Sequence, residues 1–420
     1  MPEELSEVRV MGEDALTVLV SASEVKSSAP AMSATSMRRP PFVLDSTGFI
    51  AIISLRPPRG RYSSTESPFY KPLVILSSVT DVIKALGCWR RVTATNSVET
   101  DVSHFGALFA ATAAASEGTQ PLAAGGVIVA GMGGSGIAGR LAQALAERCG
   151  GLRVRAWNDY GLPAWADGSE RLIAVSYSGN TAETLSGVER AIELGCKWEA
   201  ITTGGRLAAL AREHGARVTA VEPGHQPRAA LPLLLVPLLR RLPITGIAAQ
   251  LAEAGEVLGA AGDGGSPAGD SDATSPTAIA AQLAGKLPFI YGAGGLATVA
   301  YRWRCQFAEN AKQLAAHHAL PELDHNEIVG WAAPPPNAVV VALREPDEPA
   351  RVAARWEATR AAAWRDVPVI ECRARGESPL ARWLSLVQLG DAVSVELARL
   401  NGVEPTPVAV IEELKRRLEE

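Results

Sequence analysis

Two short segments rich in glycine and hydroxyl residues are suited to binding an anion. The first, GMGGSG at residues 131–136, stands between an apolar run and an amphipathic stretch. A glycine turn between a strand and a helix presents free backbone N–H groups and the positive end of the helix dipole. Gly131, Gly133 and Gly136 also have the G-x-G-x-x-G spacing of dinucleotide sites, with Asp159 placed as the ribose-binding acid. This segment alone leaves both dinucleotide and sugar phosphate open.

The second segment, SYSGNTAET at residues 176–184, supplies three hydroxyls within six residues. Hydroxyls and free amides that converge on one point suit a compact phosphomonoester, with its three terminal oxygens, better than a nucleotide ring. Alternatively, Asn180 or Thr181 caps a helix and the serines belong to a turn. Together the two segments favour a phosphomonoester, and the predicted contacts are Gly134, Ser135, Ser176, Ser178 and Thr181.

Both segments lie within a regular alternation of strand and helix patterns that starts near residue 102. The predicted strands are 126–131, 152–157, 171–178, 197–203, 217–221, 337–343 and 367–372. The predicted helices are 104–115, 135–149, 181–195, 206–215, 350–365, 379–400 and 407–419. Such alternation predicts an α/β fold with parallel sheets flanked by helices. Ligands of such sheets bind where strands end and glycine turns lead into helices, which is where both segments lie.

The pattern starts a second time at residues 287–307, where LPFIYGAGGLATVAYRWRCQF repeats the order of strand, glycine turn and helix. The stretch 259–277 has almost nothing to bury and is typical of a linker. We therefore predict a first α/β subdomain at 102–258, a linker at 259–277, and a second subdomain with a C-terminal helix at 278–420. Residues 1–101 are serine-rich and predict a poorly defined, disordered extension, with strand-like stretches at 49–55 and 72–79.

Composition argues against several classes of protein. The 420 residues are 47% hydrophobic and 20% charged, with a formal net charge of −5, so no basic field attracts nucleic acid. The apolar runs are too short to span a membrane, and the first residues do not resemble a signal peptide. Five scattered cysteines form no disulfide framework or zinc motif and predict reduced thiols in a cytoplasmic protein: Cys88, Cys149, Cys196, Cys305 and Cys372.

The motifs resemble a known family. GMGGSG followed by SYSGNTAET resembles the sugar isomerase (SIS) domain, an α/β/α sandwich that binds phosphosugars. The segments at 290–312, 321–331 and 404–418 are similar to those of bifunctional phosphoglucose/phosphomannose isomerases, and the resemblance covers about residues 102–420. It implies an enzyme of carbohydrate metabolism that interconverts glucose 6-phosphate, mannose 6-phosphate or both with fructose 6-phosphate through a cis-enediolate. The chemistry requires no metal or redox cofactor, and the resemblance implies a cytoplasmic homodimer with a shared active site.

The resemblance also implies four catalytic residues. Glu309 matches the base, on a helix with an apolar stripe through Trp303, Phe307 and Leu314. His325 matches a histidine that opens the sugar ring in the neighbouring subunit, Arg228 an arginine that stabilises the enediolate, and Lys415 a lysine that assists ring opening. Thr406 is a guess for a residue near the sugar C2.

Other interpretations of these residues stay open. Glu309 could be a solvated side chain paired with Lys312. His325 could instead be structural, or bind a metal in a group with His317, His318, Glu322 and Glu327, although three convergent ligands are needed. Two departures from the family pattern affect the site: Asp324 stands where asparagine is common and adds a negative charge beside His325, and Arg140 replaces an acidic residue.

Three other functions remain as alternatives. A non-catalytic phosphosugar-binding or regulatory SIS protein would keep the pocket without turnover. A glucosamine 6-phosphate synthase would need an N-terminal nucleophilic cysteine, whereas the earliest cysteine here is Cys88. A dinucleotide oxidoreductase would bind NAD at the first glycine turn.

Overall fold

The computed structural model describes residues 7–8, 18–19, 96–123, 125–262 and 274–419. Met1–Ala94 and Thr95–Glu420 form separate units. In the first unit, β1 (Glu7–Val8) pairs antiparallel with β2 (Val18–Leu19). The strands predicted at 49–55 and 72–79 lie outside the described residues. All the predicted site residues belong to the second unit.

The first sheet of the second unit has five parallel strands in the order β4-β3-β5-β6-β7. Its strands are β3 (Val127–Ala130), β4 (Val154–Trp157), β5 (Arg171–Val175), β6 (Lys197–Thr202) and β7 (Arg217–Ala220). The predicted parallel α/β arrangement is confirmed. β5 ends three residues earlier than predicted, so Ser176 and Ser178 lie in a loop beyond its carboxyl end.

Seven helices accompany this sheet in the described part of the chain. They are α2 (Val98–Ser103), α3 (Phe105–Ala115), α4 (Gly133–Cys149), α5 (Ala182–Glu193), α6 (Gly205–Glu213), α7 (Leu231–Arg241) and α8 (Ile247–Ala260). Alternate strand residues face opposite sides of the sheet. Val127, Val129 and Ile173 pack in one core with α4 and α7, whereas Ile128 and Leu172 pack in another with α5 and α6. Helices therefore cover both faces, as predicted.

The second sheet has four parallel strands in the order β11-β10-β8-β9. Its strands are β8 (Leu287–Ala293), β9 (Ala316–Leu320), β10 (Ala338–Arg344) and β11 (Val369–Arg373). The helices are α9 (Pro276–Leu283), α10 (Leu296–Glu309), α11 (Ala350–Ala363), α12 (Pro379–Leu400) and α13 (Ala409–Glu419), with 3-10 turns η1 (Glu322–His325) and η2 (Glu327–Ala332). Edge strand β9, with two histidines among five residues, was not predicted.

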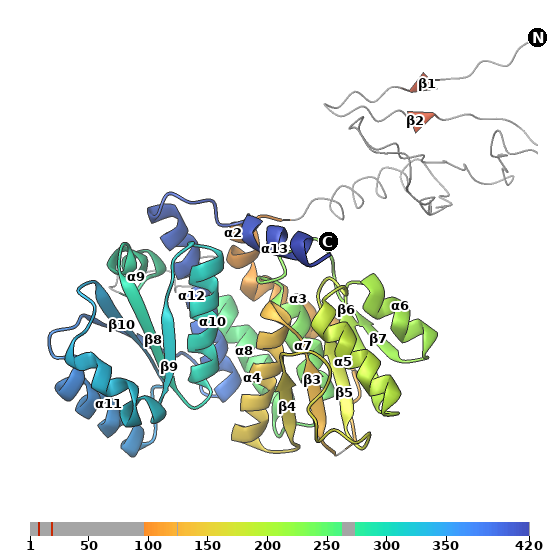
Figure 1. The fold of residues 1–420 in the computed structure, drawn as a ribbon, viewed down its shortest axis with the longest axis horizontal. Helices are drawn as coiled ribbons and strands as arrows, with labels where there is room; N and C mark the ends of the chain where they lie inside the picture. The colour runs from red at the N-terminus through yellow and green to blue at the C-terminus, as the bar shows by residue number, and fades with distance from the viewer. Residues whose placement is uncertain (1–6, 9–17, 20–95, 124, 263–273, 420) are drawn as a thin grey trace, which may run out of the picture. The chain divides into compact units, whose positions relative to one another are not determined.

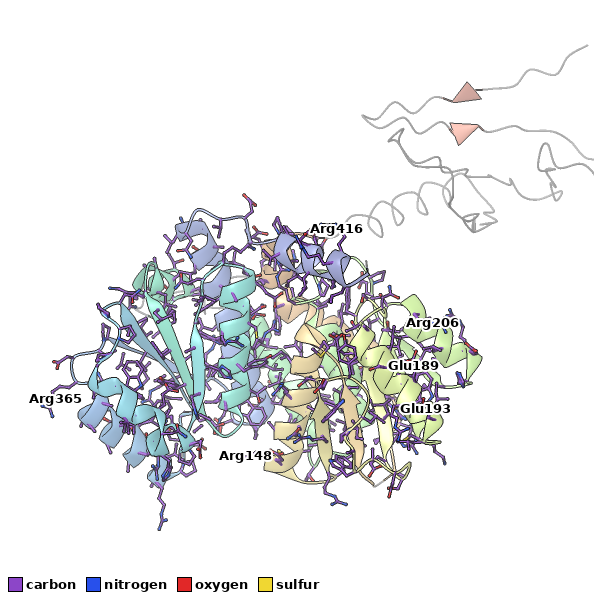
Figure 2. All side chains as sticks on the ribbon, viewed as in Figure 1. Arg148, Glu189, Glu193, Arg206, Arg365 and Arg416 are labelled. Atoms are coloured by element: carbon purple, nitrogen blue, oxygen red, sulfur yellow. The ribbon has the colours of Figure 1, made fainter. Side chains whose placement is uncertain are left out.

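Helices α4 and α10 contact each other between the two sheets (Figure 1). One hydrophobic core runs through both halves, because it includes Leu145 of α4, Leu251 of α8, Trp303 of α10 and Trp383 of α12. Side chains fill the spaces between sheets and helices, while charged residues such as Glu189 and Arg206 lie at the surface (Figure 2). The glycine turn at the start of α4 and Glu309 at the end of α10 therefore belong to one packed unit.

The expected linker at 259–277 is partly helical at its edges. α8 continues to Ala260, and α9 begins at Pro276 with Ser275 as its N-cap; the serine side chain accepts a hydrogen bond from Ala278 N. Serine followed by proline is a common helix start, because the hydroxyl satisfies a free N–H and proline needs none. Residues 263–273 lie outside the described part of the chain.

Cys196 and Cys372 are buried and free, and Cys149 and Cys305 are partly buried and free. Cys88 lies outside the described residues. None of the described helices combines the length and apolar character needed to cross a bilayer.

Candidate active site

The first glycine turn packs directly against the segment that carries Arg228. A Cβ atom on Gly134 would lie 2.6 Å from the carbonyl oxygen of Pro227 and 3.2 Å from Cα of Arg228. Gly133 has φ +53°, the left-handed region that favours glycine. Glycine therefore allows both the turn and the close approach of a second backbone at the start of α4.

The two hydroxyl-bearing segments meet beside this turn. The backbone N–H of Tyr177 donates a hydrogen bond to Ser135 Oγ over 3.3 Å. Ser176 Oγ lies 3.0 Å from Thr181 Oγ1 and accepts a bond from Gly179 N over 3.1 Å. Three of the predicted phosphate contacts thus lie close together, and the fourth hydroxyl, Ser178 Oγ, accepts from Asn180 N within the same loop.

Helix capping accounts for this loop only in part, because Thr181 is the N-cap residue of α5 by position alone. Thr181 precedes α5, but its side chain makes no capping hydrogen bond. The side-chain oxygen of Asn180 accepts a bond from Arg206 N, at the start of α6, over 2.9 Å. The alternative is thus met in part: Thr181 is the N-cap residue and the serines belong to the turn, but the Thr181 hydroxyl lies beside that of Ser176 instead of capping α5.

Arg228 is the charged centre of the site. Its side chain is 5% exposed, and its Nε donates to Asn310 Oδ1 over 2.6 Å. Its terminal NH2 group donates to the carbonyl oxygens of Pro405 and Thr406 over 2.7 and 2.8 Å. Burial lowers the pKa of the guanidinium, and the carboxylate of Glu309, 4.0 Å from Nε, acts in the opposite direction. A buried positive charge therefore faces the predicted base.

Glu309 is the last residue of α10, and its side chain is 30% exposed. Burial raises the pKa of this carboxyl, while Arg228, Arg302 and Lys312 act to lower it. A carboxylate whose pKa moves toward the working pH is a better proton acceptor. The surface ion pair with Lys312 is not formed, because Lys312 Nζ donates to the main-chain oxygen of Glu309 over 2.6 Å. Leu314 was wrongly assigned to the apolar stripe: it lies beyond α10 and is 80% exposed.

A buried ion pair between Arg302 and Asp391 contacts the backbone of Arg228. Arg302 donates to both oxygens of Asp391 in α12, over 3.0 and 2.6 Å, and to the main-chain oxygen of Arg228 over 2.9 Å. Asn310 Nδ2, in turn, donates to Ser394 Oγ. Sequence reasoning missed this network, although an acid within an apolar stretch, as Asp391 is between Leu389 and Val393, is a signal for a buried partner.

Lys312 has a structural role that the sequence did not reveal. Its φ of +53° is the only positive value of a non-glycine residue in the described chain. Besides the Glu309 carbonyl, its Nζ donates to Pro405 O over 3.0 Å and Pro407 O over 2.8 Å. Arg228 and Lys312 therefore share the Pro405 carbonyl and tie the end of α10 to the segment before α13. Because lysines at helix ends are common, the sequence offered no signal for this role.

No hydrogen bond or ion pair joins the other two predicted catalytic residues to Glu309 in the described part of the chain. His325 is exposed in η1 and has no hydrogen bond or ion pair within the described residues. Its neighbour Asp324 pairs with Arg355 over 2.9 Å and accepts from Thr359 over 2.8 Å. Lys415 is exposed on α13 and likewise has no such partner among the residues described.

Thr406 lies beside the site through its backbone, and its hydroxyl accepts a bond from Val98 N over 3.1 Å. The metal interpretation of His325 gains no support. Within the described residues no three His, Cys, Asp or Glu side chains are grouped to hold a metal ion.

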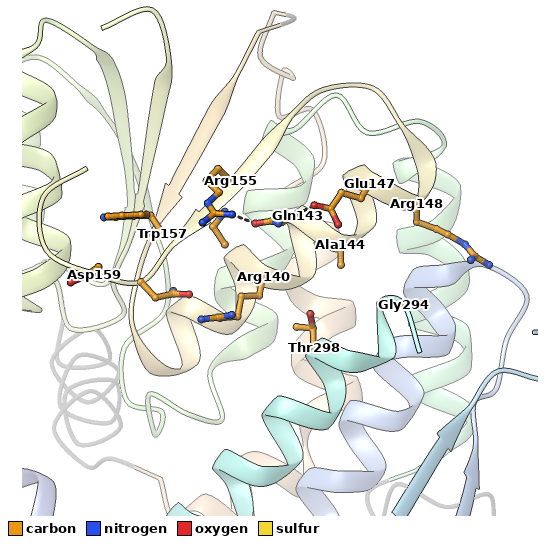
Figure 3. Close-up of a pocket in the computed structure, with 13 residues that line it drawn as sticks. Arg140, Gln143, Ala144, Glu147, Arg148, Arg155, Trp157, Asp159, Gly294 and Thr298 are labelled. Carbon is orange, nitrogen blue, oxygen red and sulfur yellow. Dashed lines mark hydrogen bonds between the residues drawn. The ribbon is translucent and has the colours of Figure 1, made fainter. Parts of the chain in front are cut away.

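A cavity of about 610 Å³ lies elsewhere, between α4 and the start of α10 (Figure 3). Arg140 of α4 and Thr298 of α10 line it, together with Arg155 of β4. None of the predicted phosphate contacts or catalytic residues lines this cavity. It is therefore separate from the cluster around Arg228 and Glu309.

Comparison with known proteins identifies the family. Residues 273–418 match the model of the bacterial phospho-glucose isomerase C-terminal SIS domain. The bifunctional phosphoglucose/phosphomannose isomerase of Thermoplasma acidophilum is 38% identical over 296 residues, which cover 70% of this chain and 89% of the relative. The chain belongs to the bifunctional phosphoglucose/phosphomannose isomerase family.

Another family member, from Caldicellulosiruptor bescii, is also 38% identical, over 304 residues that cover 70% of this chain and 89% of its own. Among solved structures, the C-terminal domain of glucosamine-fructose-6-phosphate aminotransferase from Francisella tularensis has a TM-score of 0.56 at 14% identity, covering 73% of this chain and 96% of that one. This isomerase family member therefore shares the fold of that domain, and residues 273–418 of it match an SIS domain.

Proposed function

We infer that this protein is an aldose–ketose isomerase that interconverts glucose 6-phosphate and mannose 6-phosphate with fructose 6-phosphate. The observation that carries this inference is the pair Glu309 and Arg228, a carboxyl with raised pKa facing a buried guanidinium at 4.0 Å, beside two hydroxyl-rich loops. An isomerisation through an enediolate needs a base, a fixed positive charge and a phosphate anchor. Membership of the family agrees with that chemistry.

In this proposal the phosphate anchor is made by Gly134, Ser135, Ser176, Ser178 and Thr181. Hydroxyls and backbone N–H groups at the start of α4 donate to the phosphate oxygens, and the dipole of α4 favours the negative charge. Two observations support this assignment: the hydroxyls of Ser176 and Thr181 lie 3.0 Å apart, and Ser135 Oγ accepts a bond from the backbone N–H of Tyr177, the residue after Ser176. The sugar then extends from the anchor toward Arg228, whose backbone contacts Gly134.

Glu309 is the proposed base. It removes the proton from C2 of the open-chain aldose, and the C1 carbonyl oxygen takes the negative charge of the enediolate. The proton on O2 then passes to O1, and the same carboxyl returns its proton to C1, which leaves the C2 carbonyl of the ketose. Arg228 stabilises the negative charge that develops on the enediolate. Because C2 becomes planar in this intermediate, glucose and mannose 6-phosphates share it, which explains how one site converts both epimers.

Ring opening is assigned to His325 and Lys415, and it requires a second subunit. His325 is exposed and lacks a partner in its own described chain, which is expected of a residue that acts in a neighbouring site. Histidine accepts and donates protons near neutral pH. We therefore propose a homodimer in which each protomer supplies His325 to the other. Scattered, free cysteines support a cytoplasmic location for it.

The test is a coupled assay of purified protein with glucose 6-phosphate and with mannose 6-phosphate, each with and without a chelator. Formation of fructose 6-phosphate from both sugars, unchanged by chelator, is expected. A protein that is stabilised thermally by fructose 6-phosphate but converts neither sugar would instead be the non-catalytic binding module. Stoichiometric binding of NAD would favour the dinucleotide interpretation of the first glycine turn.

A further inference from the structure

A buried carboxylate lies directly behind the loop that carries Arg228. Asp101, in the short helix α2, is 1% exposed. Its Oδ1 accepts from His225 Nδ1 over 2.7 Å and from Asn96 Nδ2 over 2.9 Å, and its Oδ2 accepts from Gln226 N over 2.6 Å. The carboxylate thus holds two consecutive loop residues, just before Pro227 and Arg228.

His225 extends this contact to the phosphate-binding loops. Its backbone N–H donates to the hydroxyl of Tyr177 over 2.9 Å, and that hydroxyl donates to the carbonyl of Glu222 over 2.9 Å. The backbone of Tyr177 is the same one that donates to Ser135. Asp101, His225 and Tyr177 therefore join α2, the 222–228 loop, the loop after β5 and the first glycine turn in one chain of hydrogen bonds.

The buried negative charge of Asp101 depends on His225 for its compensation. Its imidazole is the only ion-pair partner of Asp101 within the described residues. The hydrogen bond with Asp101 raises the pKa of His225, burial acts in the opposite direction, and Glu222 adds to the rise. Burial raises the pKa of Tyr177 to about 12, so its hydroxyl keeps the proton that it donates. A buried carboxylate without a partner is costly, so the pair favours the charged imidazolium.

We propose that Asp101 and His225 are positioning residues of the active site: their ion pair fixes the 222–228 loop against the first glycine turn and so sets phosphosugar affinity. Neither residue touches the reacting atoms. They act through the backbone of residues 226–228, which contacts Gly134, and through Tyr177, which contacts Ser135. The identity of the ligand, but not the existence of the positioning pair, rests on the proposed function.

The first test is the affinity for fructose 6-phosphate by calorimetry. Asp101→Asn keeps the shape of the side chain but removes its negative charge, and its NH2 group would face one of the N–H donors that now bind the carboxylate. His225→Asn removes the imidazole that pairs with Asp101. Each is expected to weaken binding about tenfold, the usual effect of losing one charge-assisted hydrogen bond. Tyr177→Phe, which only cuts the link to His225 and Glu222, is expected to weaken it less.

A matched control separates positioning from general stability. Glu199 and Arg241 form another buried ion pair of the first subdomain, with atoms 2.9–3.1 Å apart and no bond to the site residues. Glu199→Gln is expected to lower the melting temperature while leaving fructose 6-phosphate affinity within about twofold. An equal loss of affinity in this control and in Asp101→Asn would overturn the proposal.

The pH dependence gives a readout that a purely structural role would not show. The titratable groups that face His225 are Asp101 from α2, Glu222 from its own loop and Tyr177 from the loop after β5. Because the folded pKa of His225 is raised, the pair contributes fully at low pH and is lost as pH rises through that pKa. The ratio of wild-type to Asp101→Asn affinity should therefore fall as the pH rises above the usual histidine range. A ratio that stays constant argues against the pair.

Amide hydrogen exchange tests the pair without any substrate. Residues 222–228 should exchange faster in Asp101→Asn and in His225→Asn than in the wild type, with no such change in Glu199→Gln. Unchanged protection of this loop in both variants would sink the proposal. If the wild type converts neither sugar phosphate, the proposed function fails, whereas this exchange result still decides whether the pair positions the loop.

Discussion

The glycine turns that begin α4 and α10 have nearly the same backbone but different surroundings. Gly133 and Gly294 have φ of +53° and +56°. A Cβ atom on Gly131 would lie 3.2 Å from Cβ of Ser135, and one on Gly292 would lie 2.8 Å from Cβ of Leu296, the corresponding residue. The repeat recognised in the sequence is thus a repeat in conformation, and the difference between the turns lies in what packs on them.

The first turn faces groups that can hold a phosphate, and the second does not. Beside the first lie the hydroxyls of Ser135 and Ser176. At the second, Leu296 takes the place of Ser135, and the ring of Trp383 fills the space beside Gly295. The loop after β10 carries Glu345, a buried acid that accepts from Trp383 Nε1 over 3.0 Å. The Glu345 carboxylate is already paired with Arg148 and Arg382. The loop after β5, by contrast, supplies the hydroxyls of Ser176 and Ser178. We therefore expect no phosphate at the second turn.

The helices also end differently. Arg148 stands as far beyond Gly133 in α4 as Glu309 stands beyond Gly294 in α10. Arg148 lies 3.5 Å from Glu345, beside the second turn. Each turn therefore receives a charged residue from the end of the opposite helix: a carboxyl at the first turn and a guanidinium at the second. Only the first combination pairs a base with hydroxyl loops.

The largest effect is expected at these two helix ends. Glu309→Gln removes the proposed base and should lower kcat about 10²- to 10⁴-fold, the usual contribution of a general base. Arg148→Gln, at the corresponding position of α4, should leave kcat within about twofold, because Arg148 pairs with Glu345 at the second turn and, among the described residues, forms no hydrogen bond or ion pair with Glu309 or Arg228. Steady-state assays with glucose 6-phosphate measure both. Similar losses in the two variants would show that the second turn takes part in catalysis.

Gly134 and Gly295 occupy corresponding positions in the two glycine turns. Alanine at each should separate an effect on substrate binding from an effect on stability. Gly134→Ala places a methyl against the backbone of Pro227, which cannot move without displacing Arg228, so the KM for fructose 6-phosphate should rise at least about tenfold. Gly295→Ala collides with the Trp383 ring in the core and should destabilise by about 1–3 kcal/mol with little change in KM. Steady-state kinetics and thermal melts distinguish the two results. A raised KM in Gly295→Ala would contradict the prediction that only the first turn binds the substrate.

Hydroxyl deletions are expected to have a smaller effect. Ser135→Ala and Ser176→Ala each remove one hydrogen bond to a charged phosphate and should raise KM about tenfold with a smaller change in kcat. Thr298→Val, one turn into α10 beside the cavity, keeps the shape and should leave both constants unchanged. If Thr298→Val raised KM as much as Ser135→Ala, the substrate phosphate would lie at the second turn.

Most helices and strands could be predicted from the sequence, because segments with helix and strand periodicity alternate and are separated by clear turn residues. The hydroxyl loops could be predicted because their residue types suit one ligand. It could not predict what surrounds each turn. Trp383 and Asp391 come from α12, more than 80 residues beyond the glycines and helices they support, and no local pattern indicates such partners. Strand β9 was not predicted for a different reason. It is a half-buried edge strand, and its sequence AHHAL lacks the apolar run of a central strand.

For the site residues too, the sequence could suggest identities but not the contacts between them. Glu309 and Arg228 could be named only from the family resemblance, since an isolated glutamate or arginine is usually solvated. Their proximity depends on the packing of α10 against α4 and α12, which no residue spacing reveals. Asp101 and His225 are 124 positions apart and carry no motif, so their hydrogen bond appears only in the folded chain.

The smallest predicted effect concerns the residue just beyond each helix. Gly151 follows α4 as Lys312 follows α10, and both have positive φ, +116° and +53°. Glycine suits this conformation, whereas lysine is strained in it, and such strain is retained where function needs the side chain. Lys312→Gly should therefore relieve the backbone while removing the contacts of Nζ, so that the melting temperature changes little and kcat/KM falls several-fold.

The pH profile of that variant gives the sharper measurement. Glu309 must be ionised to act as a base, and burial raises its pKa, so kcat/KM should fall with decreasing pH at values above the usual glutamate range. The positive charge of Lys312 lowers this pKa, hence Lys312→Gly should move the acid limb to higher pH. Lys312→Arg, which keeps the charge, should not move it. An acid limb that stays in place in Lys312→Gly would mean that Lys312 acts only through the carbonyls of Pro405 and Pro407.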